Sequence, residues 1–319
     1  MHAASVERGR RGTLLGLGGA LLGAAAPAPA ASASAVRVQE VAPGVFVLPG
    51  VHEDASPAND NAIANVGFVV GGASVAVVDP GGSIRHGQRL RRAVEAATPL
   101  PIRHLVLTHA HPDHVMGAAA FADLRPEVVG HARLPEALAQ RRDGYLRMME
   151  REMGAEAAAG SDALPPTRLV EDRLDLDLGG GRVLAVSAHG LAHTDADLSL
   201  FDAATSTLWL SDLLFVERIP SLDGSLLGWL REVAALRDRP AARAVPGHGP
   251  PSVPWPEAAA ALTGYLEALR DGTRAAVASG LGIAEAPSRV ALAQASRWRL
   301  AEAYHGRNVS AAYRELEWE

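Results

Sequence analysis

The fold is decided by residues 108–114, which read THAHPDH and hold three histidines and one aspartate. A mostly apolar run typical of a buried strand comes directly before them. If that strand forms, His109 and His111 lie two residues apart and point the same way, while Asp113 and His114 turn toward a neighbouring position. One short loop can then serve two adjacent metal ions, because neutral imidazoles suit zinc or iron and a carboxylate adds a hard anionic ligand. The alternative is a histidine-rich surface loop.

Three later residues follow apolar runs, on predicted loops, and complete a ligand set: His193, Asp212 and His248. Taken singly, His193 is as easily a capping or surface histidine, Asp212 a turn or helix-capping residue, and His248 a loop histidine. Two metals with three separate ligands each and one shared ligand need seven protein groups. The order along the chain predicts His109, His111 and His193 for one metal, Asp113, His114 and His248 for the other, and Asp212 as the bridge.

Two further segments carry a family resemblance. Residues 64–71 (ANVGFVVG) and 74–82 (SVAVVDPGG) resemble the early strand pair and the Asp-x-Gly turn of metallo-β-lactamase-fold hydrolases. That superfamily includes glyoxalase II, lactonases and β-lactamases. The resemblance implies an α/β fold, an αββα sandwich of two mixed β-sheets with outer helices, and covers nearly all of the chain after its first 35 residues.

A closer resemblance is to the quinoprotein relay system zinc metallohydrolases. It rests on residues 193–198 (HTDADL), 210–225 (LSDLLFVERIPSLDGS) and the tail at 304–319. It implies a periplasmic protein that acts with a quinoprotein dehydrogenase system. The β-lactamase branches generally lack the bridging carboxylate, so Asp212 favours an ester, thioester, lactone or related acyl substrate.

The chain departs from the wider superfamily at two points. Leu191 and Ala192 precede His193 where glyoxalase II usually has Pro-Gly, and Ser211 precedes Asp212 where glycine is common. Neither departure removes an expected ligand.

The N-terminus predicts export. Arg8, Arg10 and Arg11 precede a mostly apolar stretch, and small residues that suit cleavage follow it, so residues 1–35 are expected to be a signal peptide. The paired arginines favour the twin-arginine route, with the Sec route and a retained anchor as the alternatives. We therefore expect a periplasmic protein without stable membrane insertion after cleavage.

Composition is that of a globular enzyme. The chain has 319 residues, of which 48% are hydrophobic, enough for one large core, so we expect residues 36–319 to form a single domain with a C-terminal helical tail. The net charge is −6, and removing the three arginines and one glutamate of residues 1–35 makes it −8. An acidic protein without a basic run disfavours nucleic-acid binding. Because the chain has no cysteine, disulfides and thiolate ligands are excluded.

Hydrophobic periodicity predicts strands, then alternating strands and helices, then strands, then helices. Strands are expected within residues 36–51 and 63–78, and at 102–107, 182–187, 198–201 and 207–210. Helices are expected at residues 85–97, 114–121, 134–153, 226–237 and 256–279, with a linker at 160–167.

Several other residues near the expected site have two readings. A loop at residues 51–61 is expected either to overhang the metals with His52, Glu53 and Asp54, or to be a solvated turn. Some histidines and aromatics could either support or line the site or be purely structural, and lone residues of these types are more often structural. They are His131, His189, Tyr145, Phe215 and Trp229. His305 is expected to serve packing or an interface.

Together these patterns predict a metal-dependent hydrolase with two zinc ions per chain, or iron in their place, that uses a metal-bridging hydroxide on a small-molecule acyl substrate. Asp113 and His114 are the expected catalytic residues, with Asp113 orienting the hydroxide. Two alternatives stay open: a mono-iron dioxygenase of the same fold, and a non-catalytic metal-binding accessory protein for a quinoprotein dehydrogenase.

Overall fold

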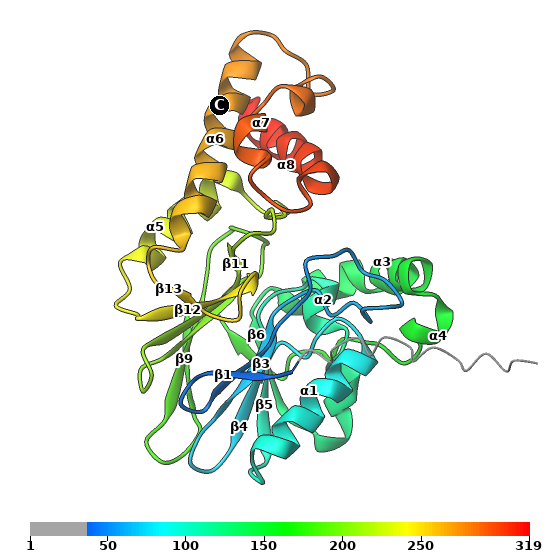
Figure 1. The fold of residues 1–319 in the computed structure, drawn as a ribbon, viewed down its shortest axis with the longest axis vertical. Helices are drawn as coiled ribbons and strands as arrows, with labels where there is room; N and C mark the ends of the chain where they lie inside the picture. Colours follow the sequence, from blue (N-terminus) through cyan, green and yellow to red (C-terminus); the bar gives the residue numbers. More distant parts are fainter. Residues whose placement is uncertain (1–36) are drawn as a thin grey trace, which may run out of the picture. The chain divides into compact units, whose positions relative to one another are not determined.

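The computed structural model describes residues 37–319, and the expected signal peptide lies outside this range. Two mixed β-sheets pack face to face, and helices cover their outer faces (Figure 1). This is the αββα sandwich that the sequence predicts.

The first sheet has seven strands in chain order. Strands β1 to β4 are antiparallel neighbours, whereas β4 to β7 are parallel, as crossovers through α1 and later helices require. The strands are β1 (Gln39–Ala42), β2 (Val45–Leu48), β3 (Val66–Val70), β4 (Val75–Val78), β5 (Ile102–Leu107), β6 (Glu127–His131) and β7 (Arg168–Val170).

The second sheet has six strands in the order β13-β12-β11-β10-β9-β8. Only β11 and β12 are parallel, and both carry expected metal ligands. The strands are β8 (Arg173–Asp177), β9 (Val183–Ala188), β10 (Leu198–Asp202), β11 (Thr207–Phe215), β12 (Arg243–His248) and β13 (Val253–Pro254).

Helices on the first sheet's side lie early in the chain, and those on the second sheet's side lie late. The early set is α1 (Ile84–Ala97), α2 (Pro112–Val115), the 3-10 helix η1 (Ala118–Leu124), α3 (Leu134–Met153) and α4 (Ala155–Ala158). The late set is α5 (Leu226–Arg237), α6 (Ala259–Ala278), the 3-10 helix η2 (Ala286–Ser288), α7 (Leu292–Ala295) and α8 (Ala301–Leu316). Among the described residues, no helix is long and apolar enough to cross a membrane.

Strand alternation assigns side chains to the layers. In β4, Val75 and Val77 pack toward the helices with Leu90 of α1, whereas Ala76 and Val78 pack toward the second sheet. Strands buried on both faces explain why this segment reads as a continuous apolar run.

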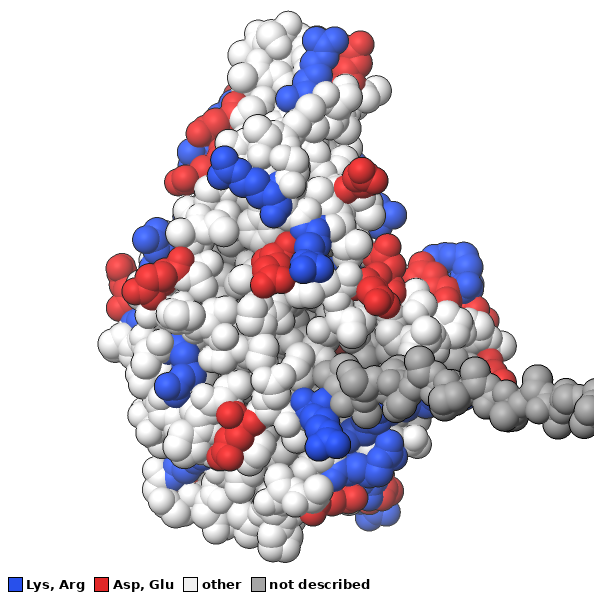
Figure 2. All heavy atoms as spheres, in the orientation of Figure 1, with Lys and Arg blue, Asp and Glu red and all other residues white. Residues whose placement is uncertain are grey.

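On the surface, Figure 2 shows arginine and acidic side chains interspersed on the face in view.

Two predicted elements were wrong in extent. The helix expected at residues 114–121 is the short α2 followed by η1, because the Gly117 N–H donates to the Gly81 carbonyl oxygen at 2.7 Å and not to a helical partner. The strand expected at residues 207–210 runs on to Phe215, so Asp212 lies within β11 and not on a loop. Its register is irregular there, and Ser211 has a positive φ of 47°, which re-aims the next side chain.

The sequence did not predict the short strands β6, β7, β8, β12 and β13. His248 is accordingly the last residue of a strand rather than a loop residue.

Candidate metal centre

The THAHPDH cassette spans the end of β5 and the start of α2. Thr108 follows the strand, and its N–H and hydroxyl both donate to the buried Asp79 carboxylate, at 2.8 Å each. His111 precedes Pro112, which starts α2. Proline suits the first turn of a helix because its missing N–H is not needed there. The strand end and the helix start therefore fix a loop of only four residues.

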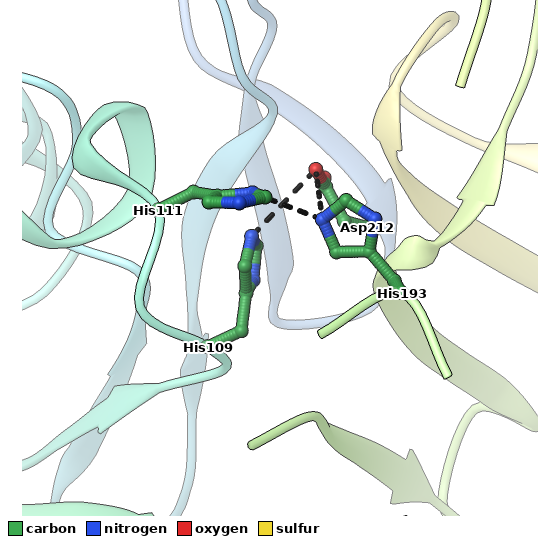
Figure 3. Close-up of side chains that lie close together, drawn as sticks. All are labelled: His109, His111, His193 and Asp212. Carbon is green, nitrogen blue, oxygen red and sulfur yellow. Dashed lines mark hydrogen bonds and ion pairs between the residues drawn. The ribbon is translucent and has the colours of Figure 1, made fainter. Parts of the chain in front are cut away.

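One cluster consists of His109, His111, His193 and Asp212, whose ligand atoms all lie within 4.8 Å of one another. Figure 3 shows the four side chains pointing toward one space from separate parts of the chain. Asp212 Oδ2 lies 3.2 Å from His193 Nε2 and 3.6 Å from His109 Nε2. His111 Nδ1 lies 3.0 Å from His193 Nε2.

The second cluster consists of Asp113, His114 and His248, again within 4.8 Å. His248 Nε2 lies 3.3 Å from Asp113 Oδ2. Asp212 also reaches this cluster, since its Oδ1 lies 3.1 Å from His114 Nε2 and its Oδ2 lies 3.5 Å from His248 Nε2. The structure thus brings together all seven residues chosen from the sequence, in the predicted grouping, with Asp212 between the clusters.

In three of these histidines, the ring nitrogen that points away from the cluster has an oxygen partner. His114 Nδ1 lies 2.9 Å from Asp79 Oδ2, and His248 Nδ1 lies 2.9 Å from the Ile63 carbonyl oxygen. His111 Nε2 lies 3.2 Å from Asp223 Oδ2. Such partners take the N–H of the imidazole and leave the lone pair of the other nitrogen for a metal.

Buried atoms without partners test whether a metal fits. Within residues 37–319, His109 Nε2 is buried and makes no hydrogen bond, while His114 Nε2 and Asp212 Oδ1 have no well-aligned partner besides the 3.1 Å ion pair between them. An unpaired buried polar atom costs about 1–3 kcal/mol, and all three atoms converge on one space. Five imidazoles and two carboxylates also form a donor set that suits zinc or iron. The two clusters therefore fit a dinuclear metal site.

Protonation in the site follows from burial and charge. Burial lowers the pKa of His109 well below its usual 6.5, and the neighbouring His114 acts in the same direction. Burial raises the pKa of Asp113, but the charges of His114 and His248 outweigh it and the net pKa is lowered. Burial lowers the pKa of His114, yet Asp212 and Asp113 outweigh it and raise the pKa well above 6.5. A metal would displace that proton, so loading should release protons.

The loop that carries His193 is tied to α5. His189 Nδ1 lies 2.8 Å from Glu232 Oε2, and its Nε2 lies 2.7 Å from Ser199 Oγ. These three side chains are connected in the order of a serine-histidine-acid triad. Ser199 is only 2% exposed, however, so substrate cannot reach it. The three side chains therefore anchor the loop, and His189 has a structural role. The Trp229 ring then packs on His193 with 5.1 Å between ring centroids.

The remaining ambiguous residues divide between packing and the rim. His131 accepts the Arg133 N–H, and His305 lies 3.0 Å from the Tyr265 hydroxyl and 2.8 Å from a main-chain oxygen, so both are structural. Phe215 and Trp229 are fully buried in the core, where they also contact site histidines. His52 lies at the rim, 3.4 Å from Glu217.

Sequence reasoning missed two carboxylates that contact expected ligands. Asp79 was noted only as part of a turn, and Asp223 only as part of a motif, although both contact expected ligands. The available signal for Asp79 was a lone acidic residue at the end of the apolar strand β4, where a buried charge needs a partner.

Comparison with known families agrees with this geometry. A family model described as the metallo-β-lactamase superfamily matches residues 60–248, which include all seven residues. The chain belongs to the metallo-β-lactamase superfamily. Members of this superfamily are mostly, though not always, metal-dependent hydrolases. A search of curated proteins gave no match.

Several solved structures share the fold at low identity. TMB-1 is 17% identical with a TM-score of 0.56, over 72% of this chain and 96% of that one. A metallo-β-lactamase from Pontibacter korlensis is 16% identical with a TM-score of 0.56, over 72% and 98%. The stereoselective inverting sec-alkylsulfatase Pisa1 from Pseudomonas sp. is 15% identical with a TM-score of 0.66, over 89% of this chain and 51% of that one. At these identities the likeness concerns the fold alone.

Proposed function

We propose that this protein is a periplasmic dinuclear-zinc hydrolase of an ester, thioester, lactone or related acyl substrate. The observation that carries the proposal is Asp212, whose two oxygens face both clusters at 3.1–3.6 Å. A carboxylate in this position is suited to join two metals. A single-metal site would leave one cluster of buried imidazoles and carboxylates without a use.

Zinc at both clusters would supply Lewis-acid polarisation of an acyl carbonyl and a lowered pKa for water at neutral pH. His109, His111 and His193 would hold one ion, and Asp113, His114 and His248 the other. Asp113 is the most exposed member of the second cluster, and its lowered pKa keeps it ionised, so it can accept a hydrogen bond from an attacking water. Asp79 keeps the His114 ring oriented. No serine or cysteine nucleophile is required: the chain has no cysteine, and Ser211 is buried and bonded to Asp79.

Metal analysis tests the proposal directly. We expect about two zinc ions per chain in protein purified without chelator, and one or fewer in Asp212→Ala. Asp202→Ala is the matched control, because Asp202 is an equally buried carboxylate that pairs with Arg182 instead of facing the histidines. One iron per chain would favour oxygen chemistry, and no metal would refute the mechanism.

Turnover is tested on a panel of 4-nitrophenyl acetate, a lactoyl thioester, γ-butyrolactone and a chromogenic β-lactam. We expect hydrolysis of at least one of the first three, and its loss in Asp212→Ala. A metal-loaded protein inactive on every acyl substrate would favour the accessory-protein reading.

The periplasmic assignment rests on the arginines and apolar stretch of residues 1–35. Fractionation of cells that express the full chain should place the protein in the periplasm, and replacing Arg10 and Arg11 with lysine should block export only if the route is twin-arginine. Retention in the cytoplasm would contradict the assignment.

The link to a quinoprotein dehydrogenase system rests on the resemblance at residues 193–198, 210–225 and 304–319. Deleting the gene should lower quinoprotein dehydrogenase activity, and a His109→Ala copy should fail to restore it. Unchanged activity after deletion would end this part of the proposal.

A further inference from the structure

A polar network joins the loop at residues 51–61 to the C-terminal helix α8. The Tyr304 hydroxyl donates to Asp54 Oδ1 at 2.6 Å. Arg218 donates to the Tyr304 oxygen at 3.2 Å and, through its other terminal nitrogen, to the Glu53 carbonyl oxygen at 2.8 Å. Two elements separated by about 250 residues are thereby connected through one phenol and one guanidinium.

The bond between Tyr304 and Asp54 lies at the surface, but the guanidinium that contacts Tyr304 is buried. Arg218 is only 5% exposed, and its guanidinium lies 5.5 Å from the Tyr304 ring centroid. The Arg307 guanidinium lies over the same ring, 5.6 Å from its centroid, so two cations stabilise the position of the ring. A buried guanidinium needs partners, and the loop and the tyrosine supply them.

The network adjoins the second metal cluster. Arg218 follows β11, and two residues before it the Val216 N–H donates to the carbonyl oxygen of His248 at 2.9 Å. The loop closes at its base through Val51 N–H to the Ala62 oxygen, at 3.0 Å, and the next residue, Ile63, accepts from His248 Nδ1. The segment after β11 and the base of the loop, which the network joins, are therefore both hydrogen-bonded to His248.

The far side of the loop is held separately. Asp60 pairs with Arg89 of α1, and its carbonyl oxygen accepts from Ser83 at 2.6 Å. In Figure 1 the blue loop after β2 lies below α8 and overlaps α2 in this view. The side near Asp54 is thus the one that depends on α8.

Most of the loop and all of α8 lie outside the residues 60–248 that the family model matches. The connection between them therefore lies outside the part of the chain that the family model matches. Because Ile63, just after the loop, lies 2.9 Å from His248 Nδ1 through its carbonyl oxygen, the loop is anchored beside one cluster.

We propose that Tyr304 is a positioning residue that, with Arg218, holds the loop at residues 51–61 against the Asp113/His114/His248 cluster and so restricts access to that half of the site. The restriction of access rests on the proposed metal site, whereas the holding of the loop does not.

Hydrogen-deuterium exchange of the full chain tests the holding of the loop. Tyr304→Phe removes one hydroxyl and keeps the ring, and we expect about tenfold faster exchange in residues 51–61 with no change elsewhere, because a hydrogen bond to a carboxylate is lost. Tyr313→Phe is the matched control on the same helix, since that hydroxyl donates to the Leu281 oxygen. Equal loop exchange in wild type and Tyr304→Phe would overturn the proposal.

A double-mutant cycle assigns the effect to the bond itself. Asp54→Ala should speed loop exchange about as much as Tyr304→Phe, and the double variant should add little, because both changes remove the same contact. Additive effects would show that Tyr304 acts by another path and would overturn its role as the holder of Asp54.

Access is measured as the rate at which zinc-loaded protein loses metal to dipicolinate, a small anionic chelator. We expect several-fold faster loss in Tyr304→Phe and a wild-type rate in Tyr313→Phe. Faster loop exchange with an unchanged rate would overturn the restriction of access. Failure to bind zinc would refute the proposed function, while loop exchange would still decide the role of Tyr304.

Discussion

Asp79→Asn is the most informative single change, because it alters one atom of the carboxylate that orients His114. Asp79 is fully buried and faces four donors. Its Oδ1 accepts the Thr108 N–H, and its Oδ2 accepts from the Thr108 hydroxyl, the Ser211 hydroxyl and His114 Nδ1, at 2.8–3.1 Å. An asparagine amide puts an NH₂ group at one of these oxygen positions. In one orientation it opposes His114 Nδ1, and in the other it opposes the Thr108 N–H.

The magnitude follows from that conflict. One buried donor is left without an acceptor, which costs about 1–3 kcal/mol of the unfolding free energy, and full burial favours the upper half of that range. If the amide turns its NH₂ toward His114, the ring is driven to the tautomer with hydrogen on Nε2, the atom that faces Asp212. We therefore expect zinc affinity at this cluster to fall about 10–100-fold.

The assay is a chelator competition titration of both zinc sites beside urea unfolding of the metal-free proteins. Asp202→Asn is the control, because Asp202 is a similarly buried carboxylate that binds Arg182 and Thr205. It should lose stability and keep both metals. If Asp79→Asn binds two zinc ions with wild-type affinity, the orienting role of Asp79 is refuted.

Two other changes test neighbouring parts of the argument. Gly247→Ala should lower zinc occupancy, since a Cβ there would lie 1.8 Å from Asp212 Oδ1, whereas Gly264→Ala, with no atom within 4 Å, should keep both metals; equal zinc content in the two would contradict this. The hydrogen bond to His189 lowers the pKa of Glu232 below its usual 4.5. A carboxylate with a lowered pKa stabilises the fold above its usual value and loses that contribution as the pH falls through the lowered one. In urea unfolding, the free energy of unfolding of wild type should therefore exceed that of Glu232→Gln near pH 7, and the two values should converge below pH 4.5. A difference in unfolding free energy that is independent of pH would count against the ion pair.

The sequence could predict which side chains come together, because local spacing constrains part of the set. His109 and His111 follow a strand at fixed offsets, and the strand's apolar character is legible from the sequence. Alternation could not predict the position of Asp212, because the irregular register of β11 and the left-handed backbone of Ser211 depend on pairing with β12. The two carboxylates that contact the expected ligands were also missed because their contacts depend on tertiary packing.

Asp79 and Asp223 meet their histidines through packing between residues far apart in the chain, which no local pattern records. The same limit applies to Tyr304, whose contact with Asp54 joins residues about 250 positions apart. Residue type and spacing predicted which side chains cluster, whereas tertiary packing determined the groups that contact them.

The expected ligands come from both sheets: His109 follows β5 of the first, whereas Asp212 and His248 lie in β11 and β12 of the second. Metal binding by this set would therefore be coupled thermodynamically to the docking of one sheet on the other. At a free metal concentration a thousandfold above the dissociation constant, each site would add about 4 kcal/mol to that docking. During synthesis, the complete set is absent until residue 248 has joined its sheet, so metal retention would report that the sandwich has closed.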